Sequence, residues 1–600
     1  MLNDLKRVWG ILLKKEKNSI FIAALAQTTS GLLESISIIS IMPILYIFTN
    51  KNIIYENKYL NFIFNYTSST TETFLILCII FSFIIIVASH FFKVFSLWYA
   101  NKISMEIWHS LHNRLFKFYL FRDYKFHLLN SSNSLLEKLQ IRVNAVVAGV
   151  VTPIFNLLSS LSTILFISIF LLINEFEISI AIFVFLFLFY FIVYSNLNKK
   201  IEKYGQMGPI FSKQAFKLIS DSLLAIKEIK ISHNEDFYTN LFNPIAKKYC
   251  KSIVNKNLFS VVPASVIEII IFGLLLFSIF LLSSYKYDLY LLAPTIGLLF
   301  FSFRKLMPAF QNIYMHVSHI KFYKPSFEII YDDLKTAFNE NIKIQDRSMN
   351  YKKIDFKSEI KLENVIFNYN SKEKFFLDDV SFNIKKGEFV GIVGKSGSGK
   401  TTIMDIMLGL LNPQKGKILI DNVLLSDENI YDWQSITGYV PQMGFITDGT
   451  ILDNIAFSIE SEKIDIERVK LVSKIAQISE FIENELSQKY NTLIGERGVR
   501  ISGGQRQRIC LARALYLNPA ILFLDEATSA LDMLTEKKLM QSIKNNLGEK
   551  TIIMIAHRIS TVENCDKIFF FDQGTLIDSG KFEELLKRNP DFKEMSKSYN

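Results

Sequence analysis

The first half of the chain carries long apolar runs, whereas the second half alternates short apolar runs with charged, helix-forming stretches. Each long run reaches the roughly 20 residues that a helix needs to cross the core of a bilayer. The sequence therefore predicts six transmembrane helices, at 19–48, 74–99, 146–173, 178–196, 258–282 and 289–307.

The apolar pattern changes near residue 330, and this change predicts the main domain boundary. We expect an all-helical membrane domain followed by an α/β domain, and hence a multidomain membrane protein. The predicted parts are a membrane domain over 1–330, a linker over 331–356 and an α/β domain over 357–600.

Charge fixes the expected orientation. The formal net charge is +10, and the basic residues flank the apolar spans, which favours membrane insertion over nucleic-acid binding. The loop at 174–177 has no basic residue, while the stretches after the second and fourth spans are long and basic. These two stretches should lie in the cytoplasm with both chain ends. The first span is long and lacks a cleavage site, so it is interpreted as a retained helix rather than a signal peptide.

One outer loop is longer than the others. In it, Tyr59, Leu60, Ile63 and Phe64 share one face of a possible helix. An amphipathic helix on the outer leaflet and an ordinary packed loop both fit this periodicity.

Ionisable residues inside the apolar spans need an explanation, because placing a charge in the core of a bilayer costs free energy. Hydrogen bonds between helices would explain the acidic ones, and Lys93 could snorkel to the interface. The functional hypothesis is a central cavity that attracts an anionic head group. Its candidate lining residues are Glu34, His90, Lys93, Glu268 and Arg304.

A phosphate-binding loop is the most specific signal in the second half. A short apolar strand leads into a glycine-rich segment, and an apolar helical stretch follows. Glycines let backbone N–H groups turn towards phosphates, and the helix N-terminus adds a favourable dipole. Lys400 should reach the phosphates of ATP, and the Thr401 hydroxyl should bind Mg²⁺. The loop residues are Gly394, Lys395, Ser396, Gly397, Ser398, Gly399, Lys400, Thr401 and Thr402.

A second strand, at 520–524, ends in two carboxylates. Asp525 is suited to hold Mg²⁺, partly through water, and Glu526 to polarise the water that attacks ATP. The four cysteines are scattered and show neither metal-site nor disulfide spacing.

Together these motifs resemble those of ABC transporter ATPases. Ile501 precedes Ser502, Gly503, Gly504 and Gln505, which look like the family's signature motif with Ile in place of Leu. The resemblance implies further functional residues and loops: adenine-stacking Tyr369, the Q-loop residue Gln442 that links Mg²⁺ to the membrane half, a D-loop at 529–532 that ends in Asp532, the switch histidine His557 and an exporter X-loop at 495–498.

The family mechanism implies that a phosphate loop and a signature motif from different chains enclose each ATP. A second copy of this chain, or a related half, should therefore complete the transporter. Short coupling helices are expected near 122–127 and 232–237. The order of a membrane domain before an ATPase resembles exporters, so no separate binding protein is expected.

A narrower resemblance connects the membrane half to bacterial flippases for lipid-linked oligosaccharides. It rests on Glu34 with Met42-Pro43, Pro263 with Glu268, the segment 304–308, and the start of the outer-loop helix at 57–60. It implies a polyprenyl-linked glycolipid as cargo and the inner membrane as location, with the ATPase in the cytoplasm. An exporter of drugs or peptides and an ATP-gated channel or sensor are the alternatives.

Overall fold

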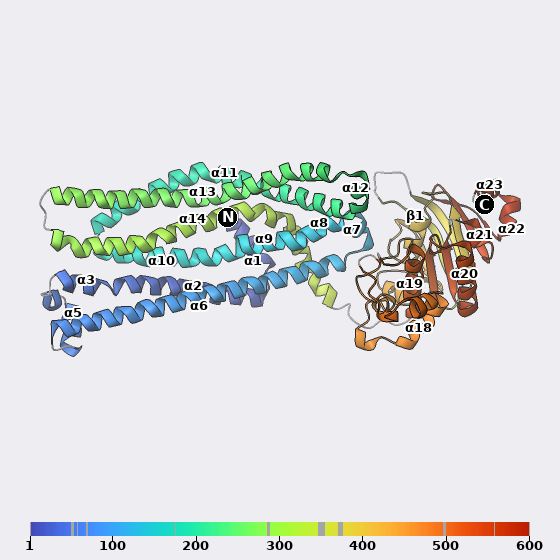
Figure 1. Cartoon of the computed structure of the whole chain (residues 1–600), viewed down its shortest axis with the longest axis horizontal. Coiled ribbons are helices and arrows are strands. Elements are labelled where there is room, and N and C mark those ends of the chain that lie inside the picture. Colours follow the sequence, from blue (N-terminus) through green and yellow to red (C-terminus); the bar gives the residue numbers. More distant parts are fainter. Residues whose placement is uncertain are drawn as a thin grey trace. The chain divides into compact units, whose positions relative to one another are not determined.

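The structure is a computed structural model, and it describes residues 2–49, 53–56, 58–67, 70–174, 176–284, 289–345, 355–369, 376–495, 498, 500–556 and 558–598. Two compact units make up the chain. The first comprises Met1–Arg122 and Asn130–Asp346, and the second comprises Asp123–Leu129 and Arg347–Asn600. Figure 1 shows a helical first unit and a second unit built around β-strands.

Helices account for all the regular structure that is described in the first unit. Two π-helical turns, η1 (Lys138–Arg142) and η2 (Val147–Val151), lead from α8 through α9 to α10. The α-helices are α1 (Leu2–Ile11), α2 (Lys14–Ile39), α3 (Met42–Thr49), α4 (Ile53–Glu56), α5 (Lys58–Thr67), α6 (Thr71–Leu120), α8 (Ser132–Glu137), α9 (Val143–Val146), α10 (Thr152–Asn174), α11 (Phe176–Leu224), α12 (Ile226–Ser232), α13 (Glu235–Ser284) and α14 (Leu289–Gln345).

Four described helical stretches are long and apolar enough to cross a membrane: Lys14–Thr49, Thr71–Leu120, Ser132–Asn174 and Glu235–Ile270. The remaining predicted spans, at 178–196 and 289–307, lie within α11 and α14. The predicted fold class, a helical membrane domain followed by an α/β domain, is confirmed.

Two details differ from the expected pattern. The first predicted span is two helices, because α2 ends at Ile39 and α3 begins at Met42. Pro43 has no N–H to offer the carbonyl of Ile39, so the break falls where the helical ladder loses a donor. At the other end of the unit, α14 runs on to Gln345, so residues 331–345 of the expected linker are helical.

Close packing joins α2 to α10. A Cβ atom on Gly31 would lie 2.0 Å from Ser162 Oγ, so a larger residue would push the two helices apart. Ile38 and Ile167 belong to a buried cluster that α14 completes. On α6, by contrast, large apolar side chains such as Phe81 are exposed, as expected of a surface that faces lipid.

The outer-loop segment forms the helix α5. Phe64 is buried, and its ring meets that of Phe74 edge to face at a centroid distance of 5.3 Å. Leu60 packs beside this cluster, whereas Ile63 is exposed. The side chain of Tyr59 lies outside the described residues. The packed face of α5 is thus centred on Phe64 and covers the start of α6.

The second unit contains two sheets. The antiparallel sheet has the order β2-β1-β4-β5, and the larger sheet has the order β10-β9-β3-β8-β7-β6, parallel except for the pair β9–β10. The strands are β1 (Glu359–Phe367), β2 (Leu377–Lys385), β3 (Phe389–Gly394), β4 (Lys415–Ile420), β5 (Val423–Leu424), β6 (Thr437–Val440), β7 (Ile521–Asp525), β8 (Thr551–Ile555), β9 (Lys567–Asp572) and β10 (Thr575–Gly580).

Every residue of β7 and β8 is buried, as expected for central strands of a parallel sheet that is covered on both faces. The helices of this unit are α7 (Tyr124–Leu129), α15 (Lys400–Met407), α16 (Ile430–Ser435), α17 (Ile451–Ile455), α18 (Ile466–Ile475), α19 (Gly503–Tyr516), α20 (Met533–Leu547), α21 (Ile559–Val562), α22 (Phe582–Arg588) and α23 (Pro590–Ser598), with helical turns η3 (Ser461–Lys463), η4 (Phe481–Glu485) and η5 (Lys489–Asn491).

The two segments expected to be coupling helices adopt different structures. The first overlaps α7 (Tyr124–Leu129), which belongs to the second unit, and Lys125 Nζ in this helix lies 6.0 Å from the centre of the Phe367 ring. The second is a sharp turn. There α12 ends at Ser232, His233 takes a left-handed conformation with φ 52°, and α13 begins at Glu235.

Candidate functional site

The phosphate-binding loop connects β3 to α15. Gly399 has φ 96°, a conformation that side chains disfavour, and a Cβ there would lie 2.7 Å from Leu377 Cδ2. A Cβ on Gly394 would lie 2.1 Å from the carbonyl oxygen of Phe571. These glycines keep the loop wrapped closely around the N-terminus of α15. The result is a cradle of backbone N–H groups that fits a phosphate.

Lys400 is the first residue of α15, and its side chain is buried against this loop. Its Nζ donates to the carbonyls of Gly394 and Lys395, at 2.8 and 2.9 Å. Burial lowers the pKa of the ammonium, while nearby Glu526 and Asp525 act to raise it. The lysine and the two carboxylates, distant in sequence, therefore share one site.

Tyr369 follows β1 and contacts the helix that begins at the phosphate-binding loop. Its hydroxyl lies 3.1 Å from the hydroxyl of Thr402 in α15. Its ring stands edge-on to Phe367 and Phe376, with centroid distances of 5.0 and 5.3 Å. The aromatic residue expected to stack on adenine is thus fixed to the phosphate-loop helix.

The carboxylates stand at the end of β7. Asp525 is buried, and Glu526 has a left-handed backbone with φ 50°, which is uncommon for a residue with a side chain. Strain of this kind concentrates at functional sites. The side-chain amide of Gln442 donates to Glu526 Oε2 at 2.6 Å. Carboxylate, amide and hydroxyl oxygens are the ligands that Mg²⁺ prefers, so Asp525, Gln442 and the nearby Thr401 fit this ion.

The signature motif begins α19. Ser502 Oγ accepts from the backbone N–H of Gln505, and the Gln505 side chain accepts from the backbone N–H of Ser502. This reciprocal cap fixes the N-terminus of α19, whose first residue is Gly503. A Cβ on Gly504 would lie 2.9 Å from Leu531 Cδ2, so this glycine allows α19 to approach the D-loop.

The remaining motif residues are only partly described. Asp532 caps α20, and its Oδ1 accepts from the backbone N–H groups of Leu534 and Thr535 at 3.1 and 2.9 Å. His557 lies outside the described residues, as do residues 496, 497 and 499 of the X-loop region.

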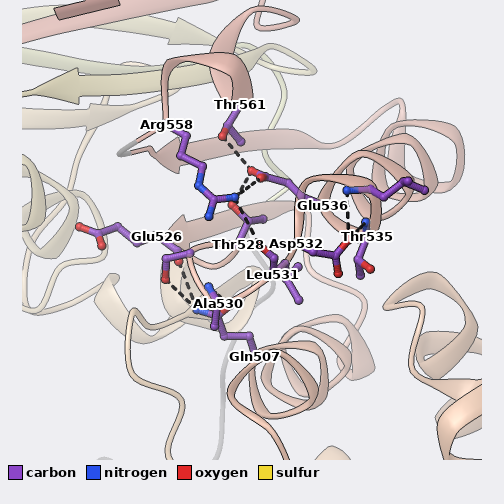
Figure 2. Close-up of polar contacts among 12 residues, drawn as sticks. Gln507, Glu526, Thr528, Ala530, Leu531, Asp532, Thr535, Glu536, Arg558 and Thr561 are labelled. Carbon is purple, nitrogen blue, oxygen red and sulfur yellow. Dashed lines mark hydrogen bonds and ion pairs between the residues drawn. The ribbon is translucent and has the colours of Figure 1, made fainter. Parts of the chain in front are cut away.

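Two polar residues that the motif reading missed organise the segment after Glu526 (Figure 2). Gln507 donates to the carbonyl of Glu526 at 3.3 Å and accepts from the N–H of Ala530 at 3.1 Å. Glu536 accepts hydrogen bonds from Thr528 and Thr561. Each stands close in sequence to a recognised motif, Gln507 two residues after Gln505 and Glu536 four after Asp532. That position beside a motif was the signal in the sequence, because burial and hydrogen-bond partners arise only when the chain folds.

Asp405 is a further carboxyl group beside this site. It lies within α15, and burial together with the charge of Asp525 raises its pKa to about 6. Burial raises the pKa of the Tyr124 hydroxyl in α7, and the nearby carboxyl group of Asp405 raises it further. Helix α7 therefore extends the site beyond the recognised motifs.

A cavity of about 710 Å³ lies within the first unit, between α2, α6, α10 and α14. Glu34, His90, Lys93 and Arg304 all line it, so four of the five candidate residues come together. Glu34 and Lys93 form an ion pair in which Oε1 and Nζ are 2.5 Å apart.

Two residues change the expected composition of this cavity. Lys305, next to Arg304, also lines it, so three basic side chains face one carboxylate. Glu268 does not line the cavity, because its side chain is exposed on α13. The cavity thus carries a surplus of positive charge within an apolar helical unit.

Comparison with known proteins places the second unit in a family. The model for the ABC transporter family matches residues 377–529. An ATP-dependent lipid A-core flippase of Haemophilus influenzae is 38% identical over 245 residues, which cover 41% of this chain and 41% of that protein. The alpha-hemolysin translocation ATP-binding protein HlyB of Escherichia coli is 41% identical over 234 residues, which cover 39% of this chain and 32% of that protein.

The chain thus matches less than half the length of these curated relatives. A solved structure of a bacterial Atm1-family ABC exporter with ATP bound covers 98% of both chains, with a TM-score of 0.74 and 21% identity. That likeness extends over both units and concerns the fold. The second unit of the chain is an ABC transporter domain, and the whole chain has the fold of an ABC exporter half-transporter.

Proposed function

We propose that this chain is an ATP-driven exporter whose second unit hydrolyses ATP. The phosphate cradle, Lys400 and the carboxylates of Asp525 and Glu526 support this proposal, because together they supply phosphate binding, a metal ligand and a base. The cargo would pass through the helical first unit.

In the proposed reaction, Tyr369 orients the adenine and Lys400 holds the outer phosphates. Mg²⁺, when bound, would neutralise charge that develops on the phosphates, and Thr401, Gln442 and Asp525 would hold it. Glu526 accepts a hydrogen bond from the water that attacks the last phosphate, and His557 is proposed to stabilise the charge that results.

Two copies of the chain are proposed to form the working transporter. The Ser502 cap and the two glycines after it would close over an ATP that the phosphate loop of the partner copy holds. One chain carries one such loop and one signature motif, so two copies would enclose two ATP molecules. A related half-transporter could take the place of the second copy.

The cavity of the first unit carries the proposal about cargo. Its basic surplus suits an anionic head group, and the exposed apolar surface of α6 suits a lipid tail. We propose a polyprenyl-pyrophosphate-linked oligosaccharide, or a related glycolipid, that is flipped across the inner membrane. The relative that is named as a lipid A-core flippase supports a lipid cargo.

A protein or peptide cargo is the second candidate. It is favoured by the relatives that are named for leukotoxin and alpha-hemolysin translocation. An uncharged cavity would suit such a cargo better than the basic one does.

ATPase measurements in proteoliposomes distinguish the candidates. The purified chain should hydrolyse ATP, a polyprenyl-pyrophosphate glycolipid should stimulate it, and E526Q should abolish hydrolysis. Hydrolysis that is lost in E526Q yet indifferent to the glycolipid, and stimulated by peptides, would replace the glycolipid with the second candidate.

A further inference from the structure

Glu536 lies in the first turn of α20, and its carboxylate is buried. Its Oε1 accepts hydrogen bonds from the hydroxyls of Thr528 and Thr561, each at 2.8 Å. Its Oε2 lies 3.2 Å from Nη1 of Arg558. Figure 2 shows the three partners converging on this one side chain.

The partners come from two segments that matter for hydrolysis. Thr528 stands two residues after Glu526, on the segment that leaves β7. Arg558 directly follows His557 in the sequence, and Thr561 lies in α21 just beyond it. One carboxylate therefore ties the segment that carries the proposed base to the segment that carries the switch histidine.

Arg558 adds a third tie. The same Nη1 atom donates to the carbonyl of Leu531 in the D-loop, at 3.2 Å. A buried carboxylate with two hydroxyl donors and a guanidinium is fully engaged, and removing its charge leaves the partners poorly satisfied. The arrangement can hold several loops in register only while all of its members are present.

We propose that Glu536 is a positioning residue for ATP hydrolysis, which holds the Glu526 and His557 segments in register through Thr528, Arg558 and Thr561. Among the described residues, its carboxylate pairs with Thr528, Arg558 and Thr561, and none of these three is proposed to contact ATP. Glu536 therefore acts on the geometry of the reaction and not on nucleotide binding. This inference rests on the proposed ATPase function.

The test is E536Q in the full-length chain in lipid nanodiscs. Glutamine preserves the volume and one oxygen for the two hydroxyls, but its amide group cannot pair with Arg558. The kcat for ATP hydrolysis should fall about 10- to 100-fold, because small misplacements of reacting groups are costly. The KM and the Kd for ATP should stay within about twofold. E363Q is the matched control, since Glu363 pairs with Lys361 and Lys417 at the sheet surface.

A mutant cycle tests the route through Arg558. If Glu536 and Arg558 act as one unit, the double variant E536Q/R558Q should have about the same kcat as the slower of the two single variants. Fully additive losses would overturn the proposed route. An unchanged kcat in E536Q, in a protein whose activity E526Q abolishes, would overturn the positioning role while the proposed function stands.

Hydrogen exchange gives a readout that does not need activity. In E536Q, amide protection should fall together in 526–532 and 558–562, and E363Q should leave both segments unchanged. Loss of protection confined to α20 would overturn the inference even if the wild-type chain proved inactive. Inactive wild-type protein, by itself, would count against the proposed function alone.

Discussion

Gln442 donates its side-chain amide to the carboxylate of Glu526 across 2.6 Å. The two residues are 84 positions apart, and they come together because β6, which precedes Gln442, pairs with β7, which precedes Glu526. The proposed water-activating carboxylate is therefore held by the residue that the family resemblance assigns to the link with the membrane half. That link gives a physical route by which the cargo could control hydrolysis.

Q442A should lower the ATPase kcat by about 10-fold and abolish stimulation by cargo, because it removes both a polar contact of Glu526 and a proposed Mg²⁺ ligand. ATPase assays with and without glycolipid measure both effects. Q488A, at an exposed position before η5, should behave as the wild type. Undiminished stimulation in Q442A would contradict this link.

G399A should weaken ATP binding and destabilise the second unit. The new Cβ would lie 2.7 Å from Leu377 Cδ2, and the φ of 96° disfavours any side chain. Strain of this kind costs about 1–3 kcal/mol. Calorimetric ATP titration and thermal unfolding measure the two effects. G10A, whose Cβ would meet nothing within 4 Å, serves as the control. Wild-type affinity in G399A would show that the loop can relax.

Asp405 should make stability depend on pH. Burial and the charge of Asp525 raise its pKa from the ordinary value of 3.8 to about 6, so the folded state holds the proton more tightly than the unfolded state. The contribution of the protonated Asp405 to the unfolding free energy is complete at low pH, and it is lost as the pH rises through about 4 to 6. D405N should therefore raise the unfolding free energy at pH 7 by about 1–3 kcal/mol. It should also reduce the decrease of the unfolding free energy as the pH rises.

Denaturant unfolding of the nucleotide-free chain, followed through the fluorescence of buried Trp433, measures this effect between pH 4 and 8. D427N changes an exposed loop carboxylate and should leave the profile as it is. A D405N profile as steep as that of the wild type would contradict the assignment.

R304E should abolish stimulation of the ATPase by an anionic glycolipid while leaving basal hydrolysis within about twofold. The change turns a surplus of positive charge in the cavity into a net charge of zero, which removes the attraction for a pyrophosphate, and charge interactions in such a setting are strong. K251E alters an exposed lysine of α13 and should change neither activity. Equal stimulation in R304E and wild type would exclude Arg304 from recognition of the cargo.

Local patterns made much of this molecule predictable. The phosphate-binding loop could be predicted because strand, glycines, Lys400 and helix are continuous in the sequence. The helical character of the membrane half followed from the length of its apolar runs. The break before Pro43 shows the limit of hydropathy, which detects apolar character and not a missing backbone donor.

Contacts between distant segments could not be predicted in the same way. Glu536 reads as an ordinary acidic residue in a first helical turn until folding brings Thr561 beside it. Likewise, Glu268 and Glu34 look alike in the sequence, yet only Glu34 lines the cavity, because helix rotation decides which face turns inward. Tertiary packing supplied this information.

The most direct test of the central claim is transfer of a fluorescent polyprenyl-pyrophosphate glycolipid between the leaflets of proteoliposomes that contain the chain. With ATP, the fraction of lipid accessible from outside should change steadily for the wild type, and it should stay constant for E526Q. ATP hydrolysis without any such transfer would contradict the proposal that this chain flips a polyprenyl-linked glycolipid.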